Sequence, residues 1–318
     1  MSQARALEPV ELSSVVRLLT DATDDITNPR RLAERLDDDG YIFLRQVLPL
    51  HAINRVAAGL RGFLAAEQII TSALGPARWS GRDPGPLGPH PPELHALGLW
   101  EAFVSHPGVR TVMATVLGDA PLSIPIAQYQ FKPPTLTGHA GPISAHQDHF
   151  FNPGLAFRTF WVPLMAIDEV LGGLTLAPRY HRSGWLHDAG RPGAPLREGA
   201  VAPQDWARAN SDPGDVVVFA GTTPHGGLPN RHPDLMRLSV DVRAQASSAP
   251  RPAIGVVLEA DDTTITVDDS GLPRRLRLDS RTVLRTDVLD AVRPCDLVGR
   301  RAIVAQDGNA ALLVRLSV

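Results

Sequence analysis

The sequence of 318 residues contains a single cysteine, Cys295, so it can build neither an intramolecular disulfide nor a zinc site made of cysteine thiolates. It contains no run of about 18 apolar residues. Its N-terminal segment, MSQARALEPVELSSVV, lacks a basic stretch followed by a continuous apolar one. We therefore expect a cytoplasmic protein that neither spans nor binds a membrane.

Lysine is also nearly absent, because Lys132 is the only one among 31 basic residues. The basic residues are spread along the chain with 34 acidic ones, without the basic stripe that nucleic-acid binding needs. Walker A, G-x-G-x-x-G, G-x-S-x-G and H-E-x-x-H motifs are missing as well. A small molecule is therefore the expected partner, and the sequence leaves the oligomeric state undecided.

The chain is apolar enough for a globular core, and its helical patterns precede its strand patterns. Helical spacing of apolar residues occurs over 10–20, 28–38, 50–73 and 97–117, the last broken at His106-Pro107-Gly108. Short β-like runs follow at 41–44, 123–131, 156–163, 173–177, 215–220 and 237–243. This order predicts a mainly β fold, a sandwich or barrel, with helices packed outside.

Two further segments stand apart in composition. Residues 75–92 are too rich in proline and glycine for a helix or strand and predict a long loop, either a lid over a binding site or a surface connection. After residue 249, two pairs of β-like runs flank the turns DDSGLP and QDGNA, which is typical of hairpins. We expect a main domain over 1–249 and a small appended β module of unknown role over 250–318.

The stretch SAHQDHF (144–150) places a carboxylate between two imidazoles. On an extended strand, His146 and Asp148 would share one face while Gln147 and His149 point away. His225, which follows the apolar run 216–219, is the best candidate for a third ligand. Two imidazoles and a carboxylate form the facial triad of non-heme iron oxygenases, but zinc could use the same ligands in a hydrolase.

The run 237–243 adds a second pattern. On a strand, Arg237, Ser239, Asp241 and Arg243 would share a face opposite three apolar residues. An arginine that points into a barrel needs a carboxylate, because its guanidinium cannot deprotonate and has a planar fork of donors. The alternative is a polar stripe at the surface with an Asp241–Arg243 pair.

Six blocks, namely DDDGYIFLRQVLP, AHQDHF, FWVPLMAID, GGLTLAPRYHRSG, PGDVVVF…PHGG and the Arg237 run, follow one another in this order. In this respect the sequence, over residues 30–245, resembles phytanoyl-CoA dioxygenase-like enzymes. The resemblance implies a double-stranded β-helix, or jelly roll, and an oxygenase that uses Fe(II), 2-oxoglutarate and O2. Such an enzyme would oxidise, most often hydroxylate, a C–H bond of a small molecule, for example in secondary metabolism, and release succinate and CO2.

The resemblance also implies roles for individual residues. Iron would be bound by His146, Asp148 and His225, and the distal carboxylate of 2-oxoglutarate by Arg237 and Ser239. Further residues expected beside 2-oxoglutarate are Gln128, Lys132 and Trp161. Residues expected beside the substrate are Trp79, Arg82, Phe150, Phe151 and Arg158.

The sequence departs from the family pattern at Ala145, where relatives commonly have Trp, and at Arg179-Tyr180-His181, where they have Gly-Ser-His. Both places lie on the expected substrate side, so a CoA-thioester substrate is not implied. A zinc-dependent hydrolase and a non-catalytic metal-binding jelly-roll protein remain as alternatives.

Overall fold

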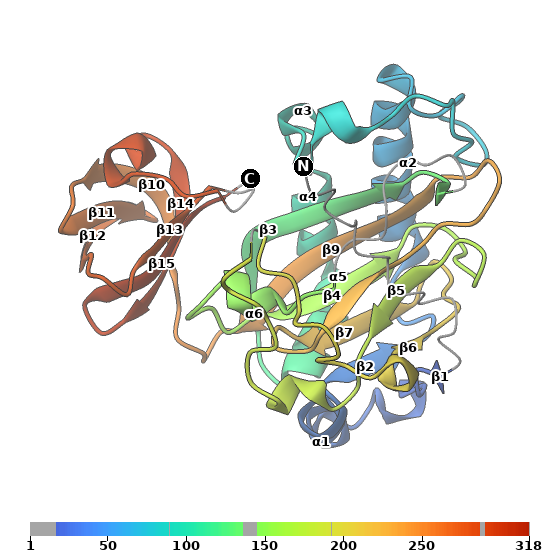
Figure 1. Cartoon of the computed structure of the whole chain (residues 1–318), viewed down its shortest axis with the longest axis horizontal. Coiled ribbons are helices and arrows are strands. Elements are labelled where there is room, and N and C mark those ends of the chain that lie inside the picture. The colour runs from blue at the N-terminus through green and yellow to red at the C-terminus, as the bar shows by residue number, and fades with distance from the viewer. Residues whose placement is uncertain (1–16, 89, 136–144, 192, 287–289, 318) are drawn as a thin grey trace, which may run out of the picture.

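The core of the molecule consists of two facing β-sheets (Figure 1). The computed structural model describes residues 17–88, 90–135, 145–191, 193–286 and 290–317. The larger sheet has the order β2-β7-β4-β9-β3, all antiparallel, with strands β2 (Tyr41–Leu44), β3 (Pro121–Lys132), β4 (Arg158–Pro163), β7 (Val216–Ala220) and β9 (Arg237–Ala246). The smaller sheet has the order β1-β6-β5-β8, with strands β1 (Arg17–Leu18), β5 (Gly173–Leu176), β6 (Ala207–Arg208) and β8 (His225–Leu228).

Side chains of the larger sheet alternate between two environments, as the period of two along a strand requires. On β9, Leu238, Val240 and Val242 join the apolar cluster on the outer face. On β7, Val217 and Phe219 point the other way and pack against residues of the smaller sheet. These apolar side chains fill part of the space between the two sheets. The rest of that space is a cavity.

Helices cover the outer face of the larger sheet (Figure 1). They are α1 (Pro29–Asp39), α2 (Leu50–Ala66), α3 (Pro92–His95), α4 (Leu99–Ser105) and α5 (Pro107–Leu117). Asn28 caps the start of α1 by accepting a hydrogen bond from the Arg31 N–H, and Gly40 ends it with a φ of 80° that favours glycine. Among the described residues, no helix is long and apolar enough to cross a membrane.

The predicted fold class, a mainly β jelly roll with helices outside, is confirmed, and each expected strand of the main domain is present. Two helix predictions need correction. The helix expected over 50–73 ends at Ala66, because the chain turns at Gln68, whose φ is 58°. The helix expected over 10–20 is wrong at its C-terminal end, because Arg17–Leu18 is a short strand. Residues 10–16 lie outside the described residues.

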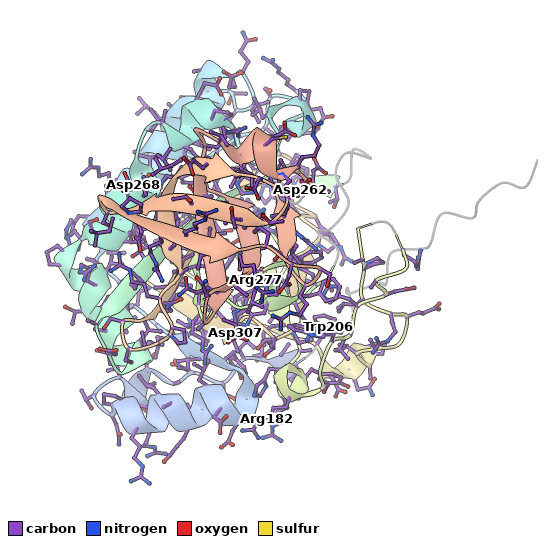
Figure 2. All side chains as sticks on the ribbon, turned by 90° about the vertical axis from the view of Figure 1, so that its left-hand side faces the viewer. Arg182, Trp206, Asp262, Asp268, Arg277 and Asp307 are labelled. Carbon is purple, nitrogen blue, oxygen red and sulfur yellow. The ribbon has the colours of Figure 1, made fainter. Side chains whose placement is uncertain are left out.

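A third sheet follows at the C-terminus, and it faces the viewer in Figure 2. Its strands are β10 (Ala253–Ala260), β11 (Thr264–Asp269), β12 (Leu272–Arg277), β13 (Val283–Arg285), β14 (Arg301–Asp307) and β15 (Ala310–Leu316). The order is β12-β11-β10-β14-β15-β13, and a further β12–β15 pairing closes the sheet on itself. The ring encloses an apolar cluster of its own, which includes Ile265, Val267 and Val314.

The C-terminal sheet also shares an apolar cluster with the larger sheet. Ile303 and Leu313 pack with Ile124 of β3 and with Phe157, which precedes β4. All four are fully buried, so this contact is closed to water. The division of the chain at residues 249 and 250 stays a prediction, because the apolar cores on its two sides are continuous at this contact.

We expect Leu313→Ala to lower the free energy of unfolding by about 2–5 kcal/mol, because it opens a cavity in this contact. Leu272→Ala is the matched control on the same sheet: Leu272 is 70% exposed and Leu313 0%. It should change the stability by less than about 0.5 kcal/mol. Denaturant unfolding measures both, and equal effects of the two substitutions would contradict the packing described here.

Candidate metal centre

A cavity of about 310 Å³ opens between the two sheets. The larger sheet lines it with polar side chains of β3 and β9, and the smaller sheet with the backbone and side chains of β5 and β8. Apolar side chains in the wall include Ile126, Phe151, Trp161, Leu174 and Phe219. A cavity that is mostly apolar with a few convergent polar groups is the usual form of a small-molecule site.

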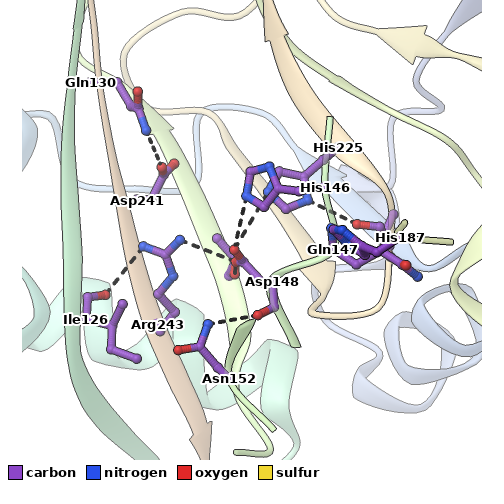
Figure 3. Close-up of polar contacts among 12 residues, drawn as sticks. Ile126, Gln130, His146, Gln147, Asp148, Asn152, His187, His225, Asp241 and Arg243 are labelled. Atoms are coloured by element: carbon purple, nitrogen blue, oxygen red, sulfur yellow. Dashed lines mark hydrogen bonds and ion pairs between the residues drawn. The ribbon is translucent and has the colours of Figure 1, made fainter. Parts of the chain in front are cut away.

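Three potential metal ligands meet in this cavity (Figure 3). The Nε2 atoms of His146 and His225 lie 3.5 Å and 3.9 Å from Oδ1 of Asp148, and the three ligand atoms lie within 4.8 Å of one another. Asp148 and His225 are buried, and the side chain of His146 is 27% exposed. Two imidazoles and one carboxylate can bind one face of a metal ion and leave its other coordination positions open for further ligands.

The backbone brings the two histidines together. His146 and His225 form an isolated antiparallel bridge in which each backbone N–H donates to the other's carbonyl at 2.9 Å. Asp148 is not on a strand, as the spacing suggested, but is the first residue of the short helix α6 (Asp148–Phe151). Gln147, fully buried, fixes this turn by donating to the carbonyls of Gly184 and Thr222.

The environment of Asp148 keeps its carboxyl ionised. Burial by itself would raise its pKa, but Arg243 first and then the two imidazoles more than offset this, so the pKa lies well below its usual range. Oδ2 accepts hydrogen bonds from Thr159 Oγ1 at 2.6 Å and from Arg243 Nη2 at 3.3 Å. Oδ1 is thereby left facing the imidazoles, where a cation would bind.

The environment of His225 keeps its imidazole neutral. Burial and then the neighbouring His146 lower its pKa to about 3. Nδ1 lies 3.0 Å from the carbonyl oxygen of Thr223, which can only accept, so Nδ1 carries the proton and the lone pair is on Nε2. A neutral imidazole whose other nitrogen donates to a carbonyl is the usual form of a histidine that binds a metal.

Arg237 lies in the same cavity and is 4% exposed. Its Nη1 donates to the carbonyl of Leu228 at 2.7 Å, while its buried Nε has no hydrogen-bond partner. Burial lowers its pKa to about 10 against the opposing field of Asp241, so the guanidinium is charged at neutral pH. Among the described residues, no carboxylate forms an ion pair with it. A buried cation of this kind fits an acidic ligand.

Other residues expected near the cofactors are divided by the structure. Gln128, Trp161 and Ser239 line the cavity, and Trp161 Nε1 donates to Ser239 Oγ at 3.1 Å. Lys132 is the strand partner of Arg237 but is not among the lining residues. Burial and the nearby Arg237 lower its pKa to about 8.

The structure also divides the residues expected beside the substrate. Phe151 lines the cavity. Trp79, Arg82, Phe150 and Arg158 are not among the described lining residues. The indole of Trp79 donates to the Arg82 carbonyl, and the ring of Phe150 stacks on His187 at 3.9 Å.

Sequence reasoning missed several residues that the structure brings to the site. His90, rather than Trp79 or Arg82, is the residue by which the 75–92 loop reaches the cavity. The alternating pattern of β9 predicted that Arg243 shares a face with Arg237. Its ion-pair partner, however, is Asp148 rather than the nearby Asp241. Arg315 comes from the C-terminal sheet, and no motif marked it.

These residues fit iron and 2-oxoglutarate. The donor set is that of a non-heme iron site, and the buried guanidinium beside it suits the second carboxylate of 2-oxoglutarate. Together with the jelly roll, they define the class of non-heme iron oxygenases.

The comparison with protein families identifies the particular family. The model described as phytanoyl-CoA dioxygenase (PhyH) matches residues 36–238, which is more than half of the chain. The chain therefore belongs to the phytanoyl-CoA dioxygenase family, as its sequence suggested. It is an enzyme of the oxygenase class, and the expected dependence on iron, 2-oxoglutarate and O2 is confirmed at the level of this class.

Individual relatives share between 21% and 27% sequence identity with this chain. The chain is 26% identical to "1-deoxypentalenic acid 11-beta-hydroxylase" of Streptomyces exfoliatus over 259 residues, 73% of this chain and 86% of that protein. The enzyme of the same name from Streptomyces arenae is 27% identical over the same length. Among solved structures, EvdO2 from Micromonospora carbonacea var. aurantiaca, complexed with 2-oxoglutarate, has a TM-score of 0.50 at 21% identity, covering 68% of this chain and 91% of that one. The last comparison supports the fold alone.

We expect Thr159→Val to weaken metal binding by about 10- to 100-fold, because Asp148 loses the hydroxyl that orients it. Thr175→Val is the matched control, since Thr175 is equally buried but donates to the carbonyl of Ala207 in the smaller sheet. Anaerobic Fe(II) titration against a chelator gives both affinities. Equal affinities for the two variants would show that the Thr159 hydrogen bond does not support the site.

Proposed function

We propose that the protein is an Fe(II)- and 2-oxoglutarate-dependent hydroxylase that acts on an unactivated C–H bond of a small molecule in secondary metabolism. The observation that carries this proposal is the presence of the His146–Asp148–His225 cluster and of the buried Arg237 in one cavity. The names of the Streptomyces relatives, both hydroxylases of a small acid, support the type of reaction.

In this proposal His146, Asp148 and His225 hold the iron. When bound, the iron with 2-oxoglutarate and O2 supplies the oxidation of the C–H bond, with release of succinate and CO2. Arg237 binds the distal carboxylate of 2-oxoglutarate, and its cost of burial is offset by that second charge. Ser239, whose oxygen accepts from Trp161, can donate its own hydroxyl proton to the same carboxylate.

The remaining residues of the cavity control ionisation and water. Arg243 holds Asp148 in its charged form and in a fixed orientation. Trp161, Phe219 and Leu174 make one part of the wall apolar, which excludes water and strengthens the electrostatic contacts inside. The chain's part in catalysis is therefore to position the substrate and the cofactors and to keep competing reactions out.

A zinc-dependent hydrolase or a non-catalytic metal-binding protein would use the same three ligands, but neither gives Arg237 a role. The buried guanidinium therefore favours the oxygenase.

The test is an anaerobic titration of the protein with Fe(II) and then 2-oxoglutarate, followed through the weak visible charge-transfer band. We expect the band in the wild type and its loss in His225→Ala. Arg237→Gln should need about 10- to 100-fold more 2-oxoglutarate, which corresponds to the loss of charge-assisted hydrogen bonds. His181→Ala is the control, because His181 contacts the carbonyl of Asp37 rather than the cavity. A wild type that binds iron but shows no band would overturn the proposal in favour of the two alternatives.

A further inference from the structure

The cavity contains two buried carboxylates, and the metal site uses only one of them. Asp148 belongs to the metal-binding cluster, whereas Asp241 of β9 lines the cavity without being part of that cluster. Asp241 is 8% exposed, so it is nearly as deeply buried as Asp148. The oxygens of a buried carboxylate need hydrogen-bond donors, which means that the partners of Asp241 have to be accounted for.

The two carboxylates differ in their partners (Figure 3). Oδ2 of Asp148 accepts from both Thr159 and Arg243, while its Oδ1 faces the imidazoles. Oδ2 of Asp241 accepts from Gln130 Nε2 at 3.1 Å. In the part of the chain that the structure describes, no other group donates to Asp241, and no cation lies within ion-pair distance of it. Its Oδ1 is therefore an acceptor that still needs a donor.

The charge of Asp241 is correspondingly less well compensated. Burial raises the pKa of its carboxyl, and the positive field of Arg243 and the hydrogen bond from Gln130 offset this only in part. At Asp148 the opposing effects are strong enough to hold the pKa well below its usual range. The difference arises because Arg243 donates directly to Asp148 and forms no ion pair with Asp241.

Neither cofactor can supply the donor that Asp241 needs. The 2-oxoglutarate dianion offers two carboxylates and a keto group, all of which only accept. Its proposed clamp, Arg237, is four positions from Asp241, about 13 Å along an extended strand, and Nη1 of Arg237 turns toward the carbonyl of Leu228 on β8. The donor therefore comes either from water or from a third molecule in the cavity, which is the substrate.

Asp241 is close enough to the metal centre to orient a substrate there. It lies two positions from Arg243, whose guanidinium reaches Asp148, and the charge of Asp148 acts on its carboxyl. Its register partner on β4 is Trp161, which belongs to the apolar part of the wall. A molecule bound to Asp241 thus lies beside the metal-binding cluster and has an apolar surface for its carbon skeleton.

We propose that Asp241 accepts a hydrogen bond from a hydroxyl group of the substrate, and that it thereby selects a small alcohol and orients it beside the metal. The proposal rests on the function proposed above and adds the substrate class. A hydroxyl fits better than an ammonium group, because Arg237 and Arg243 flank Asp241 on the same face of β9 and repel a further cation. A buried site built to bond a hydroxyl discriminates strongly against analogues that lack the donor.

A purely structural role of Asp241 has different consequences. If the carboxylate only balanced the charges of Arg237 and Arg243, or only bound a water molecule, its replacement would affect ligands with and without a hydroxyl group alike. The first of these roles would also change the binding of 2-oxoglutarate. A substrate contact changes the preference for the hydroxyl group and leaves the charge-transfer band in place.

The test uses the full chain loaded anaerobically with Fe(II) and 2-oxoglutarate, titrated calorimetrically with cyclohexanol, fluorocyclohexane and cyclohexylammonium. Fluorine is nearly the size of a hydroxyl group but has no proton to donate. The wild type should prefer cyclohexanol. Asp241→Asn keeps the shape of the side chain and can still accept from Gln130, but it should reduce the preference over fluorocyclohexane by about tenfold or more. Asp262→Asn, in the exposed turn between β10 and β11, is the control and should match the wild type.

The possible results separate the substrate contact from its alternatives. The hydroxyl subsite would be overturned by equal binding of the alcohol and the fluoride to the wild type, by failure of the alcohol to bind, or by tighter binding of the ammonium. An unchanged preference in Asp241→Asn, or loss of the charge-transfer band in that variant alone, would overturn it as well. Absence of the band in the wild type would instead overturn the proposed function, so the two failures are distinguishable.

Discussion

The site depends on a carboxylate that must stay charged where water scarcely reaches it. Asp148 is 5% exposed, and a lone carboxyl so deeply buried would take up a proton. Arg243 of β9 and then the two imidazoles prevent this. Thr159 of β4 is the register partner of Arg243 and donates to the same carboxylate oxygen. Removing one member of such a buried pair typically costs about 3–5 kcal/mol, because the other charge is left uncompensated. The register of β4 and β9 therefore sets the metal site.

Strand β9 serves the core and the site at once. Its apolar residues face the helices, and its polar ones, from Arg237 to Arg243, face the cavity. Each of these polar groups is buried, and each needs a partner from another element or from a ligand: Asp241 accepts from Gln130, and Arg243 donates to Asp148. The buried Nε atoms of Arg237 and Arg243 have no hydrogen-bond partner, and Arg237, which also forms no ion pair with a described carboxylate, is where a bound acidic molecule fits.

The C-terminal sheet changes how the active site is delimited. Its strands follow the part of the chain that matches the family, yet Arg315 lines the cavity and Leu313, two positions earlier on β15, packs in the shared apolar contact. The C-terminal sheet therefore both packs on the metal-binding segment and supplies part of the cavity wall.

The sequence by itself determined the alternation of β9, most of the helices and the hairpins, because period and local turn chemistry are written in neighbouring residues. The order of its motifs, rather than any local pattern, singled out His146, Asp148 and His225. It could not place Asp148 at the start of a helical turn, choose Asp148 over Asp241 as the partner of Arg243, or exclude Trp79 and Arg82 from the cavity. It gave no signal for Arg315, which lies 163 positions from Asn152 in the chain. Only the tertiary structure decided these contacts, because they depend on which faces of distant elements are packed together.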